Sequence, residues 1–237
     1  MNEVTLLRRK LKEVPLRSRM RTAWEQLVGQ EFSDTNYAEW EGPLLYKPEA
    51  GHWIFHTVQW PASHRIDLRN CDLAQLKKFI KLAKKFKSVR IQIHTEDADP
   101  VQIELYVLKQ LADAGNVKLM TTSLEVYDTR SDVPDLSKTD SVVIQPLVLS
   151  GVEVFTLAPG VQIRVDGPDA KLSFRTVEVK YSSHLDFCQP AECHTMRLQE
   201  TTIPENLTVL SRAEFDRCEV SRTYGIGRLR AVLFYDC

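Results

Sequence analysis

The pattern of apolar and polar positions predicts a helix and a strand between residues 73 and 94. Over residues 73–86 the apolar residues recur every three or four positions, which is the period of a helix with one buried face. From Val89 to Ile93 apolar and polar residues alternate, which is the period of a strand. The apolar stripe of the predicted helix consists of Leu76, Phe79, Ile80, Ala83 and Phe86.

The two periods alternate through the first half of the chain. Residues 65–68 and 117–127 are predicted strands, and a helix is expected between them with Asp99 as its N-cap and Pro100 in its first turn. Gly115 marks the end of that helix. A chain that runs strand, helix, strand, helix, strand predicts crossover connections on a parallel or mixed sheet.

The pattern changes after a polar segment at residues 128–140. No helical period follows it, and short alternating runs are separated by turns such as Ser150-Gly151 and Pro159-Gly160. Such runs predict a β-sandwich or a jelly-roll-like domain, and no internal repeat is evident in them. The expected fold class is therefore α+β, with an α/β domain over residues 1–129, a linker over 130–140 and a β-rich domain over 141–237.

Charge is unevenly distributed along the chain. Residues 1–90 hold 17 Lys and Arg against 10 Asp and Glu, whereas residues 91–237 hold 14 against 22. A positively charged half is typical of proteins that bind an anionic partner, although two oppositely charged halves of one fold also attract each other. The candidate contact residues are Arg8, Arg9, Lys10, Lys77, Lys78, Lys81, Lys84, Lys85, Lys87 and Arg90.

This basic surface leads to the first functional hypothesis, a non-enzymatic binding protein that contacts nucleic acid. Lysines neutralise phosphates, and aromatic residues between Asn36 and Trp60 favour RNA because they can stack on bases. Lysine is more abundant than arginine in the candidate helix, so bidentate recognition of base edges is not indicated. The expected binding has low sequence specificity.

A second hypothesis is a module for protein interaction or assembly, of viral or regulatory type. Val4, Leu7, Leu11 and Val14 form an apolar stripe on a predicted N-terminal helix that could dock on a partner or on a second copy of the chain. The basic surface would then contact an acidic protein or an anionic membrane surface.

The segment "HLDFCQPAECH" predicts the one candidate metal site. It holds His184, Cys188, Cys193 and His194, and thiolate and imidazole groups are good zinc ligands. The chain has five cysteines, no apolar run long enough to span a bilayer and no secretory signal. These features predict free thiols and an intracellular location, in the cytoplasm or the nucleus.

The sequence contains no recognisable catalytic constellation, and apart from the candidate zinc no cofactor is expected. Residues 201–217, "TTIPENLTVLSRAEFDR", resemble a strand and phosphate-binding segment of the dUTPase and dCTP-deaminase family. Ser211 and Arg212 match the start of that segment, whereas Ala213 and Glu214 replace its two serines. The resemblance implies a jelly-roll strand, and it adds a third hypothesis, a nucleotide-handling enzyme or a degenerate form of one.

Overall fold

The computed structural model describes residues 19, 22–23, 52–60, 65–66, 73–85, 88–95, 100–129, 141–168, 171–218 and 229–237. For residues 52–60, 65–66 and 92–95 it defines the backbone alone. The predicted linker at 130–140 and the predicted N-terminal helix with Val4, Leu7, Leu11 and Val14 lie outside these ranges. In the described part of the chain, no helix has the length and apolar character needed to cross a membrane.

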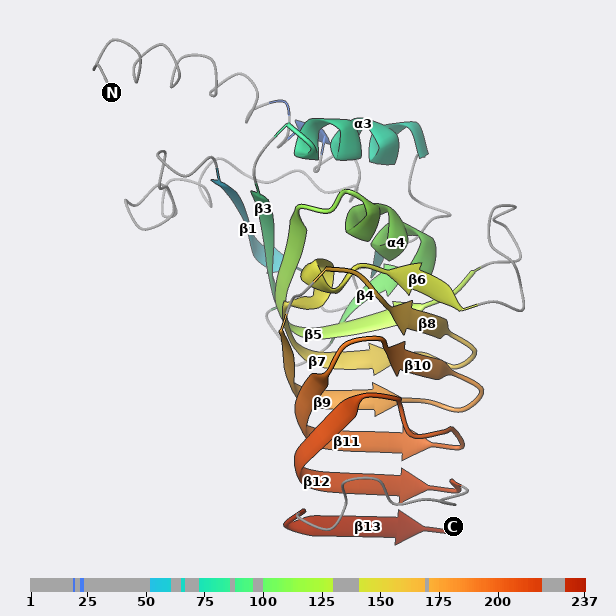
Figure 1. Ribbon diagram of the computed structural model, residues 1–237. Coiled ribbons are helices and arrows are strands. Elements are labelled where there is room, and N and C mark those ends of the chain that lie inside the picture. Colours follow the sequence, from blue (N-terminus) through green and yellow to red (C-terminus); the bar gives the residue numbers. More distant parts are fainter. Residues whose placement is uncertain are drawn as a thin grey trace.

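The described residues include three helical elements and thirteen strands, most of which Figure 1 labels. They are β1 (His52–Trp60), β2 (Arg65–Ile66), α3 (Leu73–Ala83), β3 (Ser88–Thr95), β4 (Val101–Glu104), α4 (Leu105–Asp113), β5 (Val117–Tyr127), β6 (Val142–Ile144), the 3-10 helix η4 (Pro146–Leu149), β7 (Gly151–Leu157), β8 (Gln162–Val165), β9 (Leu172–Val179), β10 (His184–Phe187), β11 (Ala191–Gln199), β12 (Leu207–Asp216) and β13 (Ala231–Tyr235).

The strands form two parallel sheets. The larger sheet has the order β1-β3-β5-β7-β9-β11-β12-β13, with β4 and β2 attached beside β5. The smaller sheet has the order β10-β8-β6. All described strand pairs in both sheets are parallel. Figure 1 shows β5, β7, β9, β11, β12 and β13 of the larger sheet stacked one below another towards the C-terminus.

From β5 to β11 the chain alternates between the two sheets, so that each turn of chain lies on the one before it. Strands β6, β8 and β10 belong to the smaller sheet, and β7, β9 and β11 follow them in the larger one. Residues 101–235 thereby form a parallel β-solenoid of about 5 turns.

Buried apolar side chains stand in columns inside the solenoid. Phe155, Val177, Met196 and Ala213 occupy successive positions of one column, 22, 19 and 17 residues apart along the chain. All four are buried. In parallel strands the register places each apolar position beside its equivalent in the next turn, so one core runs through the whole stack.

Aromatic rings connect the two sheets across this core. Phe155 and Phe174 stack at a centroid distance of 5.7 Å within the larger sheet, and Phe187 from the smaller sheet lies 6.1 Å from Phe174. All three rings are almost completely buried. Aromatic side chains bury a large apolar area, so these contacts are a main source of stability for the solenoid.

The predicted fold class is wrong, since the C-terminal part is not a sandwich or a jelly roll. Alternation located several strands correctly, including β8 and β9, but it carries no information about strand direction. A sandwich is built from antiparallel strands, whereas every described pair here is parallel. The repeated turns of the solenoid were not predicted either, because each column holds different apolar residues at unequal spacings along the chain.

The elements from β1 to β5 follow the predicted alternation of strands and helices. Helix α3 lies between β1 and β3, α4 lies between β4 and β5, and the pairs β1–β3 and β3–β5 are parallel. Strand β5 then pairs with β7, so the larger sheet continues from this segment into the solenoid. The second helix begins later than predicted: residues 101–104 form β4, and α4 starts at Leu105.

The aromatic contacts of the core give a prediction for stability. Phe174 is 1% exposed and Phe234 is 52% exposed. We expect Phe174→Ala to lower the free energy of unfolding by about 3–5 kcal/mol, because it leaves a cavity between the sheets. The control Phe234→Ala should cost only about 1 kcal/mol, because half of that ring is already in solvent. Urea denaturation of both variants measures the difference, and equal losses would contradict the proposed core.

Candidate functional site

Helix α3 separates its apolar and basic side chains onto two faces. Leu76, Phe79, Leu82 and Ala83 are buried and belong to the common core, and Ile80 packs against it. This set agrees with the predicted stripe except for Leu82, which is buried in addition, and Phe86, which lies outside the described residues. Because the helix is fixed to the core by one face, the orientation of its opposite face is also fixed.

The opposite face carries five exposed lysines: Lys77, Lys78, Lys81, Lys84 and Lys85. At 100° per residue they fall within about 120° of the helix circumference, and at 1.5 Å per residue they extend over about 12 Å. We call these five residues the lysine face. It is a compact positive surface about as long as three or four phosphate steps of one nucleic-acid strand.

The lysine face lacks ion pairs with the residues that the structure describes. Elsewhere in the described chain, lysines do have such partners: Lys109 Nζ lies 2.7 Å from Asp113 Oδ2, and Lys180 Nζ lies 2.7 Å from Glu125 Oε1. Part of the lysine face has a structural use, since positive charge near the C-terminus of a helix interacts favourably with its dipole. The interaction with the helix dipole is confined to the last turn, so it does not explain the presence of Lys77 and Lys78.

The other predicted contact residues do not join this face. Val89 and Ile91 of β3 are buried in the same core as α3, so the exposed Arg90 between them points to the opposite side of the sheet. There it pairs in register with Lys118 of β5. Burial lowers the pKa of Lys118, and the positive charge of Arg90 lowers it further. Arg8, Arg9, Lys10 and Lys87 lie outside the described residues.

The predicted zinc site is wrong. Cys193 and His194 are consecutive residues of β11, and Cys193 is buried in the core whereas His194 is exposed on the other face. His184 Nε2 lies 2.6 Å from Asp186 Oδ2, and Arg164 Nε donates a hydrogen bond to Cys188 Sγ. Among the described residues no group of three or more potential ligands could hold a metal ion. Alternation along a strand separates the adjacent ligands that the sequence motif had brought together.

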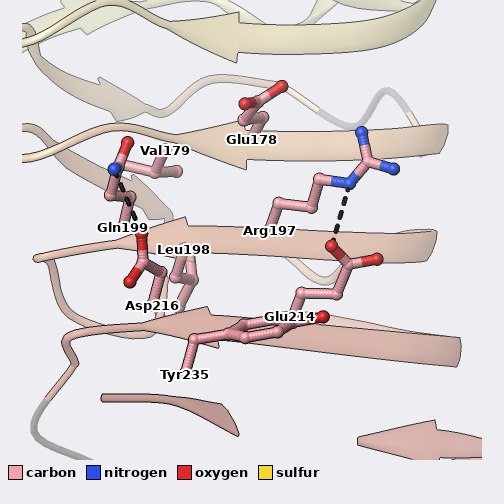
Figure 2. Close-up of a pocket in the computed structure, with 8 residues that line it drawn as sticks. All are labelled: Glu178, Val179, Arg197, Leu198, Gln199, Glu214, Asp216 and Tyr235. Atoms are coloured by element: carbon pink, nitrogen blue, oxygen red, sulfur yellow. Dashed lines mark hydrogen bonds and ion pairs between the residues drawn. The ribbon is translucent and has the colours of Figure 1, made fainter. Parts of the chain in front are cut away.

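A polar groove of about 460 Å³ lies on the outside of the larger sheet, near its C-terminal end. Figure 2 shows its lining side chains on β9, β11, β12 and β13. Two rows of outward positions cross these strands in register. The first row is Glu178, Arg197 and Glu214, and the second is Gln199, Asp216 and Tyr235.

Contacts between neighbouring turns hold the groove together. Arg197 Nε of β11 lies 3.3 Å from Glu214 Oε2 of β12. Within β12 itself, Arg212 Nε lies 2.6 Å from Glu214 Oε1. Gln199 Nε2 donates to Asp216 Oδ2 at 3.1 Å. The groove was not predicted from the sequence. Its outward positions lie 19, 17 and 19 residues apart over the three strand steps from β9 to β13, so a recognised repeat would have aligned them.

The lining of the groove is more acidic than basic. Glu178, Glu214 and Asp216 contribute carboxylates, whereas Arg197 is the only cation among the lining residues. Carboxylates repel phosphates, and two arginines already neutralise Glu214. The groove therefore does not favour a nucleotide, and its ion pairs are suited to joining successive turns.

A buried carboxylate, Glu104, stands at the start of α4. It is completely buried, and its Oε2 accepts hydrogen bonds from the backbone N–H groups of Tyr106 at 2.6 Å and Val107 at 3.2 Å. Its Oε1 accepts from the Thr129 hydroxyl at 3.3 Å. Both oxygens are thus occupied, so Glu104 acts as the N-cap of the helix and not as a free acid or base. Burial raises its pKa, and the backbone hydrogen bonds oppose that shift.

Comparisons with protein-family models, curated proteins and solved structures find no match for this chain.

The raised pKa of Glu104 gives a prediction for the pH dependence of stability. The folded protein holds the proton of Glu104 more tightly than the unfolded chain does, so this carboxyl lowers stability as the pH rises from 4.5 through the folded-state pKa. Glu104→Gln cannot ionise. We therefore expect the wild type to lose stability relative to Glu104→Gln as the pH rises over that range, where stability is the free energy of unfolding.

Urea denaturation of both proteins at a series of pH values measures this difference. Glu104→Ala is the matched control, because it removes the same ionisation together with the helix cap. Its loss of about 1 kcal/mol or more relative to Glu104→Gln should be independent of pH. Wild-type and Glu104→Gln curves that run parallel at every pH would contradict the assignment.

Proposed function

We propose that the protein is a non-enzymatic binding protein that contacts the phosphates of nucleic acid through its lysine face. The observation that carries the proposal is the presence of five exposed lysines on one face of α3, unpaired with any described acidic residue, while the opposite face is packed into the core. A rigid surface loses little conformational freedom when it binds, apart from that of the lysine side chains themselves.

The composition of the face supports binding without sequence recognition. An ammonium group is a point charge on a flexible stem, so it neutralises phosphates but does not read base edges bidentately as arginine does. Binding by such a face is driven by the release of counterions from the nucleic acid. Affinity should therefore depend steeply on salt and weakly on sequence.

The alternatives receive less support from the described residues. The assembly hypothesis depends on Val4, Leu7, Leu11 and Val14, which lie outside them. A nucleotide-handling activity would need a positively charged pocket, whereas the groove contains three carboxylates and one arginine. Ser211 and Arg212, which carry the resemblance to nucleotide enzymes, lie in a parallel strand of the solenoid and Arg212 is paired with Glu214.

Charge reversal on the lysine face tests the proposal. The variant Lys77→Glu, Lys78→Glu, Lys81→Glu, Lys84→Glu should bind fluorescent single-stranded RNA, duplex RNA and duplex DNA at least about tenfold more weakly than the wild type, because four phosphate contacts become repulsive. Fluorescence anisotropy at low salt measures the affinity. The salt dependence of wild-type binding gives a second readout. If all five lysines contact phosphates of duplex DNA, a plot of the logarithm of the association constant against the logarithm of the salt concentration has a slope of about −4.5.

A control variant separates the lysine face from the effect of net charge. Arg164, Lys171, Arg175 and Arg230 are exposed on the solenoid, and changing them to Glu alters the net charge by the same amount. This control should keep wild-type affinity, and circular dichroism should show that both variants are folded. Equal weakening in the two variants, or no binding by the wild type at low salt, would overturn the proposal. A preference among the three probes identifies the type of nucleic acid.

A further inference from the structure

Two cysteines meet at the last turn of the solenoid. Asp216 of β12 pairs with Tyr235 of β13, and the backbone N–H of Arg217 donates to the Tyr235 carbonyl at 2.8 Å. The same parallel register, continued by two residues, places Cys218 beside Cys237. Neighbouring strands lie about 4.8 Å apart, which falls within the range of Cα separations that a disulfide spans.

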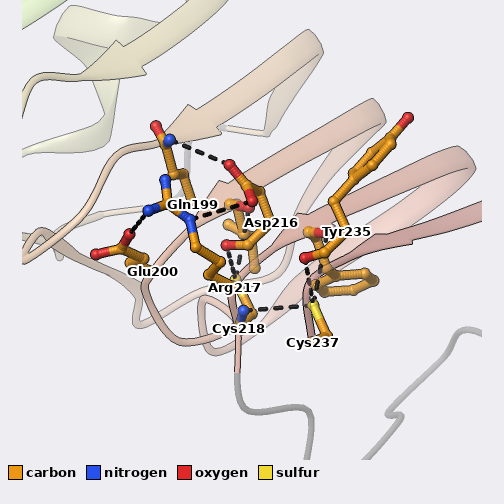
Figure 3. Close-up of polar contacts among 9 residues, drawn as sticks. Gln199, Glu200, Asp216, Arg217, Cys218, Tyr235 and Cys237 are labelled. Carbon is orange, nitrogen blue, oxygen red and sulfur yellow. Dashed lines mark hydrogen bonds and ion pairs between the residues drawn. The ribbon is translucent and has the colours of Figure 1, made fainter.

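The contacts of the two thiols agree with this register. The backbone N–H of Cys218 donates to Cys237 Sγ at 3.4 Å. The Sγ of Cys237 also lies 3.3 Å from the Tyr235 carbonyl of its own strand and 3.6 Å from the Phe215 carbonyl of β12. The Sγ of Cys218 lies 3.3 Å from the Asp216 carbonyl of its own strand and 3.5 Å from the Leu198 carbonyl of β11. Figure 3 shows the two side chains next to each other at the same end of β12 and β13.

We propose that Cys218 and Cys237 form a reversible disulfide that fastens β13 to β12. The oxidant is a low-molecular-weight disulfide. The thiolate of Cys237 attacks one of its sulfurs and releases one thiol, and the thiolate of Cys218 then attacks Cys237 Sγ in the mixed disulfide and releases the second thiol. Both cysteines are thereby oxidised, the small disulfide is reduced to two thiols, and the two protons leave with those thiols.

The difference in exposure between the two thiols fits this order of attack. Cys237 is exposed and Cys218 is 5% exposed. An exposed thiol meets the oxidant first, and a shielded neighbour is well placed to resolve the mixed disulfide. Reduction by an excess of small thiols follows the same steps in reverse.

The other described cysteines do not compete for this bond. Cys193 is completely buried in the core, and burial raises the pKa of its thiol to about 12. Cys188 is half-buried, and its Sγ accepts a hydrogen bond from Arg164 Nε at 3.0 Å. It follows β10 of the smaller sheet, whereas Cys218 and Cys237 follow β12 and β13 of the larger sheet.

The bond would have a consequence for the groove. Among the described strands, β13 pairs with β12 alone, and it carries Tyr235 in the wall of the groove. A covalent link two residues after Tyr235 removes the freedom of this strand to separate from the stack. Oxidation therefore stabilises the last turn of the solenoid and fixes one wall of the groove.

Equilibration of the full chain with mixtures of reduced and oxidised glutathione tests the proposal. After free thiols are blocked, peptide mass spectrometry should find Cys218 linked to Cys237, with the loss of two hydrogen atoms. Oxidation should raise the melting temperature by about 6–12 °C, because the bond closes the loop over residues 219–236 in the unfolded chain. Added reduced glutathione should reverse both changes.

Three variants make the test specific. Cys237→Ser changes an exposed residue and should abolish the linked peptide and the rise in melting temperature, whereas Cys188→Ser should leave both unchanged. Cys218→Ser should leave Cys237 as a stable mixed disulfide with glutathione. A linked peptide that contains Cys71 or Cys188, a persistent mixed disulfide in the wild type, or the absence of any disulfide would each overturn the proposal.

Discussion

The parallel register between successive turns is the constraint on which the rest of the structure depends. It places apolar side chains such as Phe155 and Val177 in continuous columns, and each turn buries its neighbour's inner surface. The same register aligns the outer positions, so Glu178, Arg197 and Glu214 form a polar row across the strands. It also brings Cys218 beside Cys237, although the two residues are separated by a whole turn of chain. The core, the polar row and the cysteine pair thus have a single geometric origin.

The lysine face depends on the same sheet in a different way. Strands β1 and β3 extend the larger sheet beyond the solenoid, and helices α3 and α4 pack with β3 and β5 into the common core. Burial of Leu76 and Phe79 determines which side of α3 is turned outward. The charge of that side comes from the sequence, but its exposure comes from the packing. The proposed nucleic-acid contact therefore combines a local sequence pattern with a tertiary arrangement.

Much of the local structure could be predicted from the sequence, because helix and strand periods are local properties. The basic stripe of α3 and the strand at 117–127 are examples. Strand direction is decided by contacts between distant turns, so the solenoid was mistaken for a sandwich. The groove and the cysteine pair were missed for the same reason, since their residues meet only through the register. The zinc motif failed because adjacent residues of a strand face opposite sides.

Hydrogen exchange in the presence of nucleic acid tests the central claim most directly. The amide exchange of the full chain is measured by mass spectrometry, with and without saturating single-stranded RNA at low salt. We expect slower exchange in peptides that cover residues 73–85, because bound phosphates restrict α3 and its lysines, and unchanged exchange in peptides from residues 171–218. Protection confined to the solenoid, or no protection in α3 under conditions where RNA is bound, would contradict the account.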